Sequence, residues 1–331
     1  MLKYLMIMIG ESSVPFCYYE NKTGNKNTVK LISYENLKKA VVFALKNNLK
    51  VNFLYPDFKL EKKYDTLIDE VEHIKIIPLK LRKSYKDSIL VIESGDLSSD
   101  SVLKNLKHEN VIFRLQHEQL NKLSVYLKKL IPGCKRINLV LMDIEKYGEK
   151  DIEEYKNQLE KISKKILIHQ GKANLPEMNF LTDRLTLELM NNCDAGLNHL
   201  TVAPNGKLYL CPAFYHNNEN DTLGEISNDI KIKNMQLLEL KYSPICRICD
   251  AYQCKRCVFL NKKLTAEINT PSSQQCRLSH VEREASRLFL QKLKETGVSN
   301  TSFKDIPEID YNDPYENAKK NKFTISEFKK L

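Results

Sequence analysis

The sequence lacks the long apolar runs and the glycine-rich loops that mark membrane proteins and common nucleotide-binding proteins. No segment of its 331 residues approaches the roughly 18 apolar residues that span a membrane. The opening MLKYLMIMIGESS is apolar but short, and Glu11 follows with no small-residue cleavage site. It therefore predicts a buried first strand. No GxGxxG or GxxxxGK[ST] follows a strand-like run. We expect a cytoplasmic protein with no membrane partner.

The sequence also lacks a concentrated charge of one sign. Lys and Arg number 52 and Asp and Glu 42, for a net charge of +10. Acids and bases are interleaved, as in DIEEYKNQLEKISKK (151–165), and no nucleic-acid-binding module is present. We expect no nucleic-acid partner, although the basic excess leaves a zinc-containing nucleic-acid-binding protein as a third hypothesis.

The first half alternates short apolar runs with longer amphipathic runs, as in βα units that build a parallel sheet. The strand-like runs are 4–9, 50–55, 73–79, 88–94, 110–115, 137–144 and 165–170, and the helical runs include 33–48, 117–130 and 150–165. Both Ser33 and Asp151 have the chemistry of a helix start. Six or seven such units fit a partial or complete βα barrel. An open, doubly wound sheet gives the same pattern, so the sequence pattern does not decide between the barrel and the open sheet.

The alternation of strand-like and helical runs ends at about residue 190. HLTVAPNGKLYLCP (199–212) predicts a hairpin around a Pro-Asn-Gly turn, and residues 229–243 predict a helical piece. Apolar residues at helical spacing between Leu278 and Leu288 predict a long amphipathic helix. The chain from 297 onward is polar, which predicts a flexible tail or a segment that orders against a partner.

Seven of the nine cysteines lie close together in the sequence, and we expect them to bind metal. They are Cys193, Cys211, Cys246, Cys249, Cys254, Cys257 and Cys276. In a cytoplasmic protein, clustered cysteines indicate metal ligands rather than disulfides. Four of them form two CxxC pairs only four residues apart, which is too short a loop for one zinc ion to be held by both pairs with ease.

Two iron–sulfur clusters suit seven thiolates, with one cluster fully ligated and one with an open or non-cysteine position. Three cations within the motif, Arg247, Lys255 and Arg256, are placed to offset the negative charge of a cluster. Zinc is the alternative, because the spacing alone does not separate the two metals.

The order of these cysteines resembles the SPASM domain, which follows the catalytic barrel of radical S-adenosylmethionine (SAM) enzymes that modify peptides. The resemblance rests on Cys193, on Gly206 followed after four residues by Cys211, on the close quartet, and on Cys276. The family spaces its quartet as CxxC, five residues, Cys, three residues, Cys, and each of the last two gaps is one residue shorter here.

The resemblance implies an α/β fold, with a partial (β/α) barrel of radical SAM type over 1–190. A small cysteine-rich, SPASM-like α+β domain with a C-terminal helix follows over 191–296, and the polar tail over 297–331. It assigns the distal auxiliary [4Fe–4S] cluster to Cys246, Cys249, Cys254 and Cys276. It assigns the proximal cluster to Cys193, Cys211 and Cys257, with substrate, water or a side chain as its fourth ligand. Asp194 and His199 are candidates by proximity in the sequence alone, and His280 is expected on the surface or in a hydrogen bond near the distal cluster.

Radical SAM enzymes hold their catalytic cluster with CxxxCxxC in the loop after the first strand. In this chain the loop, residues 10–27, contains only Cys17, and the other two positions are Asn21 and Gly24. Three thiolates are required, so we expect no S-adenosylmethionine binding. The remaining cysteine, Cys134, is isolated in the sequence and is interpreted as structural.

The whole chain, including LKYLMIMIGESSVPFCYYEN and SSQQCRLSHVEREASR, resembles the CXXX repeat peptide maturases. This implies a component of a system that matures a ribosomally made, cysteine-rich precursor peptide. A partner radical SAM enzyme would form a hetero-oligomer with it, and this chain would bind substrate or transfer electrons. No complete acid–base or nucleophilic constellation is recognisable, so catalytic residues stay unknown and enzyme against accessory stays open. The alternative is a zinc-stapled, non-catalytic scaffold or peptide-binding protein.

Overall fold

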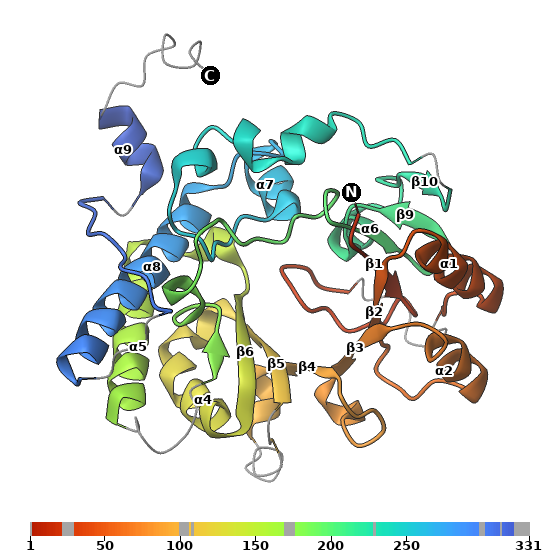
Figure 1. The fold of residues 1–331 in the computed structure, drawn as a ribbon, viewed down its shortest axis with the longest axis horizontal. Coiled ribbons are helices and arrows are strands. Elements are labelled where there is room, and N and C mark those ends of the chain that lie inside the picture. The colour runs from red at the N-terminus through yellow and green to blue at the C-terminus, as the bar shows by residue number, and fades with distance from the viewer. Residues whose placement is uncertain are drawn as a thin grey trace. The chain divides into compact units, whose positions relative to one another are not determined.

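The computed structural model describes residues 2–21, 30–98, 106, 109–168, 176–227, 230–297, 302–311 and 313–320 (Figure 1). The strands are β1 (Tyr4–Met8), β2 (Lys50–Leu54), β3 (His73–Pro78), β4 (Ile89–Glu93), β5 (Glu109–Leu115), β6 (Cys134–Leu141), β7 (Glu177–Met178), β8 (His199–Val202), β9 (Lys207–Tyr209) and β10 (Gly224–Glu225). The helices are α1 (Tyr34–Lys46), α2 (Lys62–Ile68), α4 (Leu123–Leu130), α5 (Glu149–Ile168), α6 (Pro212–Asn217), α7 (Val258–Thr265), α8 (Ser273–Glu295) and α9 (Pro314–Lys320).

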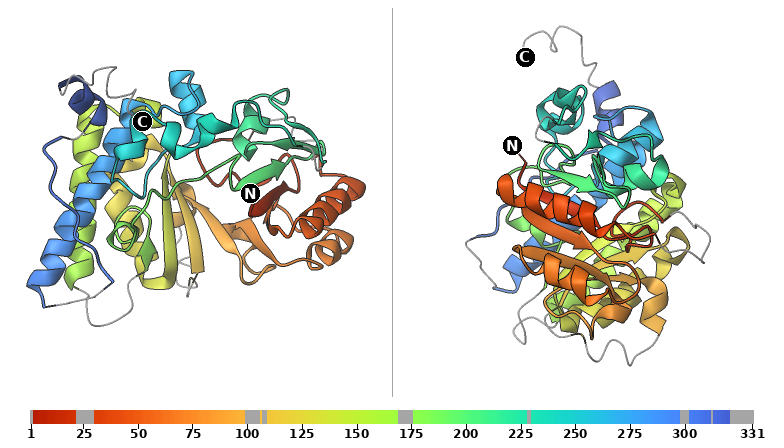
Figure 2. Two further views of the ribbon diagram at one scale, coloured as in Figure 1. Left: turned by 45° about the horizontal axis from the view of Figure 1, so that its top comes forward. Right: turned by 90° about the vertical axis from the view of Figure 1, so that its right-hand side faces the viewer.

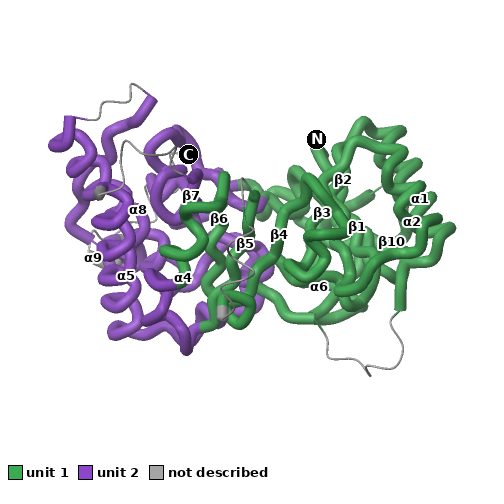
Figure 3. The backbone as a smooth tube through the Cα atoms, turned by 90° about the horizontal axis from the view of Figure 1, so that it is seen from below, with its two compact units in different colours: residues 1–116, 126–142, 194–239 green, residues 117–125, 143–193, 240–331 purple. Residues whose placement is uncertain are grey.

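The chain divides into two compact units, which Figure 3 distinguishes by colour and which are described separately. Unit 1 consists of Met1–Gln116, Tyr126–Met142 and Asp194–Glu239. Unit 2 consists of His117–Val125, Asp143–Cys193 and Leu240–Leu331. Both units are discontinuous in the sequence, and the predicted domain bounds at 190 and 296 stay a prediction.

Unit 1 is built on a sheet whose strands follow the order β10-β9-β8-β1-β2-β3-β4-β5-β6. The strands β1 to β6 are parallel, and each lies beside the one before it in the sequence. A doubly wound sheet would instead reverse its strand order at a switch point, whereas a barrel adds strands in one direction. The parallel α/β architecture of a partial βα barrel is therefore confirmed, and the doubly wound alternative is not adopted.

The strands of unit 1 form where the sequence has uninterrupted apolar runs. In β1, Leu5 to Met8 are all buried, as expected for a parallel strand that is covered on both faces. The helix α1 follows this strand and begins at Ser33, whose hydroxyl accepts a hydrogen bond from the Asn36 N–H at 3.1 Å. Figure 1 shows α1 and α2 on the same side of β1 to β3. The predicted helix start at Ser33 is confirmed.

The predicted hairpin is present as β8 and β9, which pair antiparallel, while β8 also pairs parallel with β1. Its turn requires glycine at Gly206, where φ is +80° and a Cβ atom would lie 2.4 Å from Asn36 Nδ2. The hairpin thereby extends the sheet of unit 1 and places Cys211 immediately before α6.

In unit 2, α5 and α8 pack side by side, as Figures 1 and 2 both show. The predicted long helix is confirmed as α8. It begins with a capping box in which the Ser272 hydroxyl accepts from the Gln275 N–H and the Gln275 side chain accepts from the Ser272 N–H. Asp151 lies inside the first turn of α5 rather than before it, and its carboxylate accepts from the Gly148 N–H at 2.9 Å.

Two predicted elements differ in the structure. Residues 165–170 were expected to form a strand, but α5 continues to Ile168, and 169–170 lie outside the described residues. A short apolar run fits either element, and here Ile162 and Ile166 continue the buried face of the helix. Residues 229–243 contain two short 3₁₀ turns, Met235–Leu238 and Leu240–Tyr242, in place of a longer helical piece.

The described part of the tail packs on unit 2. The Lys304 N–H donates to the Leu185 carbonyl at 2.7 Å, Arg283 donates to the Pro307 carbonyl at 2.7 Å, and the Tyr315 hydroxyl donates to the Pro271 carbonyl at 2.5 Å. Residues 321–331 lie outside the described residues, and partner binding by the tail stays a prediction. Among the helices in the described ranges, none combines the length and apolarity needed to cross a membrane.

Candidate metal site

The seven predicted ligands divide between the units, because Cys211 belongs to unit 1 and the other six to unit 2. None of the nine cysteines, all of which lie in the described ranges, forms a disulfide. Within those ranges, no three His, Cys, Asp or Glu side chains are arranged to hold a metal ion. The three thiols that the resemblance assigns to a proximal cluster, Cys193, Cys211 and Cys257, therefore stay a prediction.

Four thiols of unit 2 lie close enough to affect one another electrostatically, and we call them the quartet: Cys246, Cys249, Cys254 and Cys276. Burial, followed by the neighbouring Cys254, raises the pKa of Cys246 to about 11. Burial raises the pKa of Cys249 to about 12, with contributions from Cys254 and Cys246. The pKa of Cys276 is well above its usual range because of burial and then because of the other three thiols. These are the four residues that the resemblance assigns to one cluster.

The long helix α8 organises the quartet, because it contains Cys276 and fixes the segments on either side of the other thiols. Arg283 of α8 binds the Asp250 carboxylate with two hydrogen bonds at 2.7 and 2.5 Å, which secures the residue after Cys249. Such a bidentate pair fixes orientation as well as distance.

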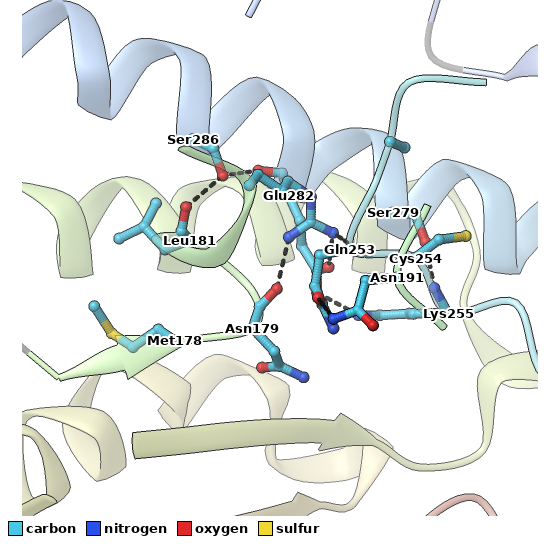
Figure 4. Close-up of polar contacts among 12 residues, drawn as sticks. Met178, Asn179, Leu181, Asn191, Gln253, Cys254, Lys255, Ser279, Glu282 and Ser286 are labelled. Atoms are coloured by element: carbon cyan, nitrogen blue, oxygen red, sulfur yellow. Dashed lines mark hydrogen bonds and ion pairs between the residues drawn. The ribbon is translucent and has the colours of Figure 1, made fainter. Parts of the chain in front are cut away.

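The segment that contains Cys254 is tied to the same helix. The Lys255 N–H donates to the Ser279 hydroxyl at 3.0 Å, and the Gln275 amide donates to the Lys255 carbonyl at 3.2 Å. Figure 4 shows Cys254, Lys255 and Ser279 together at this junction. The helix thus positions two cysteines that are distant in the sequence, Cys254 and Cys276.

Hydrogen-bond donors contact the sulfurs of Cys246, Cys249 and Cys254. The Ala251 N–H donates to Cys249 Sγ at 3.4 Å, and the Arg256 N–H donates to Cys254 Sγ at 3.3 Å. His280 Nε2 lies 3.5 Å from Cys249 Sγ. The Arg256 guanidinium lowers the pKa of Cys246 both as a charge and as a hydrogen-bond donor, against the larger effect of burial. Donors of this kind tune iron–sulfur clusters by stabilising charge on the sulfurs.

Cys257 and Cys193 are placed differently from the quartet. Cys257 occupies the N-cap position of α7. Burial raises the pKa of its thiol, and the N–H groups of Leu260 and Phe259 lower it. Within the described residues, no neighbouring thiol contributes to this shift. Cys193 is exposed. Two residues before it, the Asn191 N–H donates to the Tyr252 carbonyl at 2.5 Å, so its segment runs alongside the one that leads to Cys254.

A buried ionic network beside the quartet was not anticipated from the sequence. Glu282, 1% exposed, accepts a hydrogen bond from Arg184 at 2.7 Å and from the Tyr155 hydroxyl at 2.5 Å. It also pairs with Lys255, and Figure 4 labels both residues. Arg184 further donates to the Gln253 carbonyl. The Lys255 ammonium pairs with Glu282 and also interacts electrostatically with Cys254, and its expected role in offsetting cluster charge stays a prediction.

The sequence contained one signal for this network. Glu282 follows Leu278 by four residues and so falls on the apolar face of the predicted helix, where an acid requires a buried partner. Its partners could not be identified, because Arg184 is 98 residues away in the sequence.

In unit 1, the loop after β1 is held by a cation rather than by clustered thiols. The buried Arg114 donates to the carbonyls of Cys17 and Tyr19 at 3.3 and 2.8 Å, to Glu20 at 2.6 Å, and also to Glu93. The pKa of Tyr19 lies well above its usual range because of burial, then of Cys17, with a smaller contribution from Cys211. Asn21 is described, whereas Gly24 lies outside the described residues.

The remaining candidates of unit 1 have ordinary surroundings. Cys134 begins β6 and is buried, which raises the pKa of its thiol to about 12. The Asp194 carboxylate accepts from the Asn198 side chain at 2.9 Å. His199 is buried in β8, where its ring stacks on Tyr4 at a centroid distance of 4.7 Å.

Comparison with known proteins supports the fold. No family model matches this chain, and no curated protein matches its sequence. The chain is similar to a solved structure described as native anSMEcpe with bound AdoMet and Kp18Cys peptide, with a TM-score of 0.59 and 13% identity over 89% of this chain and 99% of that chain. This similarity confirms a fold of radical SAM type.

Two structures of Streptococcus suis SuiB align less closely. The one bound to the precursor peptide SuiA has a TM-score of 0.45 and 13% identity over 83% of this chain and 76% of that chain. The one bound to S-adenosylmethionine has a TM-score of 0.46 and 12% identity over 83% of this chain and 77% of that chain.

Proposed function

We propose that the chain binds an iron–sulfur cluster through the quartet and serves in a peptide-maturation system beside a separate radical SAM enzyme. The observation that carries this proposal is that four thiols in one unit, the buried Cys246 and Cys276 and the half-buried Cys249 and Cys254, lie close enough to affect one another electrostatically. Cys276 lies on α8, the segments that contain Cys249 and Cys254 are bound to the same helix, and backbone N–H groups donate to the sulfurs of Cys249 and Cys254.

The donor set fits an iron–sulfur cluster. Soft thiolates select zinc or iron–sulfur clusters. Each thiolate of a four-iron cluster binds a different iron, so its sulfurs lie farther apart than those around one zinc ion. The quartet supplies four thiols in one unit, which is the number that a fully ligated four-iron cluster requires.

The surroundings of the quartet suit the charge of such a group. The thiols must lose their protons when metal binds, and because their pKa values are raised, the free energy of metal binding must cover the cost of forming buried thiolates. Arg256 then faces the negative charge beside Cys246, while the N–H groups of Ala251 and Arg256 orient the sulfurs of Cys249 and Cys254. The cluster, when bound, supplies electron transfer.

We further propose that this chain does not activate S-adenosylmethionine by itself. Cys17 is the one cysteine in the sequence of the loop after β1, and the catalytic cluster of that enzyme class needs three. The partner enzyme would generate the radical, and this chain would bind the cysteine-rich precursor or pass electrons. The second cluster, on Cys193, Cys211 and Cys257, belongs to the same proposal.

Anaerobic metal analysis tests the cluster. The purified chain is expected to be brown, with about four irons and four sulfides for each cluster present. Cys249→Ala should remove about one cluster's iron and sulfide. The matched control is Cys134→Ala, which also removes a buried thiol but lies in unit 1 and should retain all of the iron. Colourless protein with stoichiometric zinc would contradict the proposal and support the scaffold alternative.

Reconstitution tests the role in maturation. A peptide with repeated Cys-plus-three-residue units should bind the anaerobic chain, and the same peptide with serine in place of cysteine should bind less tightly. The partner radical SAM enzyme should modify the peptide faster when this chain is added. Equal modification without the chain would refute the accessory role.

A further inference from the structure

One side chain near the quartet is a buried histidine whose polar contact is to a thiol. His280 of α8 is 3% exposed, and its Nε2 lies 3.5 Å from Cys249 Sγ. Among the described residues, its Nδ1 atom has no hydrogen-bond partner. An imidazole buried with one nitrogen unsatisfied costs free energy compared with an apolar side chain. The contact with the Cys249 sulfur explains why a histidine, rather than an apolar side chain, occupies this buried position.

The tail holds this histidine in place. The Tyr311 ring packs on the His280 ring at a centroid distance of 5.6 Å. On one side of this contact Arg283 binds both Asp250 and the Pro307 carbonyl. On the other side, Asp313 accepts from the Ser273 hydroxyl. We call residues 302–311 and 313–317 the strap, because these contacts fix them along α8 next to the quartet.

The strap also lies within electrostatic range of the quartet. The pKa of Tyr311 is raised by burial and then by Cys249, and burial followed by Cys276 and Cys246 raises that of Tyr315. His280 and Tyr311 both line a groove of about 450 Å³ between α5 and α8. The histidine is therefore enclosed by the helix that contains Cys276 and by the strap.

We propose that His280 donates a hydrogen bond to the metal-bound sulfur of Cys249 and that the strap, through Tyr311, holds it in that position. The proposal rests on the proposed function, because it requires a metal group on the quartet. A donor to a ligating sulfur stabilises the reduced, more electron-rich cluster and so raises its reduction potential. His280 is thus a positioning residue for cluster electronics, and the strap is an intramolecular control of the potential.

Redox titration followed by electron paramagnetic resonance tests this role. His280→Leu removes the donor while leaving the quartet, so iron content should stay at the wild-type value and the potential should fall. We expect a roughly tenfold weaker equilibrium constant for one-electron reduction, which corresponds to about 59 mV. His280→Gln places an amide donor near the position of Nε2 and should recover most of the shift.

A second pair of variants tests the strap. Tyr311→Ala removes the ring that packs on His280 and should lower the potential by a smaller amount. Tyr311→Phe keeps the ring and should match the wild type. A potential that is unchanged in iron-replete His280→Leu overturns the inference. If that variant loses its iron, the Tyr311 pair decides, and equal potentials for the alanine and phenylalanine variants overturn it. Wild-type protein without iron would instead refute the proposed function.

Discussion

The loop after β1 in unit 1 and the quartet in unit 2 use buried cations in contrasting ways. In unit 1, Arg114 binds backbone carbonyls and two carboxylates, and so fixes a loop that contains a single cysteine. In unit 2, the network around Glu282 fixes the backbone beside Cys254 against the helix that contains Cys276. In the described part of the first loop, residues 10–21, the cation fixes a segment with one cysteine, whereas in unit 2 the cations fix a segment with two CxxC pairs beside a helix that contains a further cysteine.

The largest expected effect is on iron content, which a cysteine substitution in the quartet should lower and one in the loop after β1 should not. Cys276→Ala should abolish the cluster of the quartet, because it removes one of four ligands and leaves a cavity at that site. Cys17→Ala should leave iron and sulfide unchanged. Anaerobic iron and sulfide analysis of both variants makes the measurement. Equal loss of iron in both would show that the loop after β1 contributes to the same metal group.

The next effect is on stability. Glu282→Leu leaves the buried charges of Lys255 and Arg184 unpaired, and losing one partner of a buried ionic group costs about 3–5 kcal/mol. The shift should appear as a lower urea midpoint for unfolding. Glu160→Gln removes an exposed partner of Lys164 on α5 and serves as the control, with no measurable shift expected. A midpoint for Glu282→Leu equal to that of the control would contradict the role of the network.

A pH dependence of stability should arise from His199 in unit 1. Burial lowers the pKa of His199 in the folded chain to about 4, against an unfolded value of 6.5. Between these values the unfolded chain binds the proton and the folded chain does not, so stability falls as the pH drops from 6.5 toward 4. Each unit of pKa difference is worth about 1.4 kcal/mol, so up to about 3 kcal/mol is lost.

The variant His199→Phe tests this dependence, because it keeps a ring to stack on Tyr4 and cannot titrate. Denaturant unfolding at several pH values should show a smaller loss of stability below pH 6.5 for the variant than for the wild type. Parallel curves for the two proteins would refute the assignment.

The smallest effect uses two matched helix caps. Ser33→Ala and Ser272→Ala each remove a side-chain acceptor at a helix N-terminus and should each cost about 1 kcal/mol. Only Ser272→Ala loosens the helix turn that contains Cys276, so only this variant should release iron faster to a chelator. Equal release rates in the two variants would separate the capping of α8 from metal retention.

Much of the fold could be predicted from local pattern. The strands β1 to β5 match apolar runs closely, since strands buried on both faces have little polar alternation. The strand β6 begins at Cys134, three residues before its predicted start, because Lys135 and Arg136 interrupt the apolar pattern. The end of α5 was missed because Ile166 to Ile168 fit a strand as well as a helix.

The candidate metal site, like the fold, could be predicted from the sequence only in part. The spacing of cysteines indicated a metal site, and the resemblance identified the four thiols that the structure brings within electrostatic range. What the sequence could not reveal depends on long-range contacts. The pairing of Lys255 with Glu282 and the packing of Tyr311 on His280 join segments about 30 residues apart. Such contacts follow from tertiary packing rather than from any local propensity.

Mössbauer spectroscopy can test whether the quartet binds a cluster and whether the chain binds S-adenosylmethionine. The chain is enriched in the Mössbauer isotope of iron and purified anaerobically, and spectra are recorded before and after S-adenosylmethionine is added. We expect [4Fe–4S] spectra that include a cluster, that of the quartet, whose four irons all have thiolate ligands, and we expect no change when the compound is added. A chain that contains zinc and no iron, or a spectrum in which one iron changes when S-adenosylmethionine is added, would contradict this expectation.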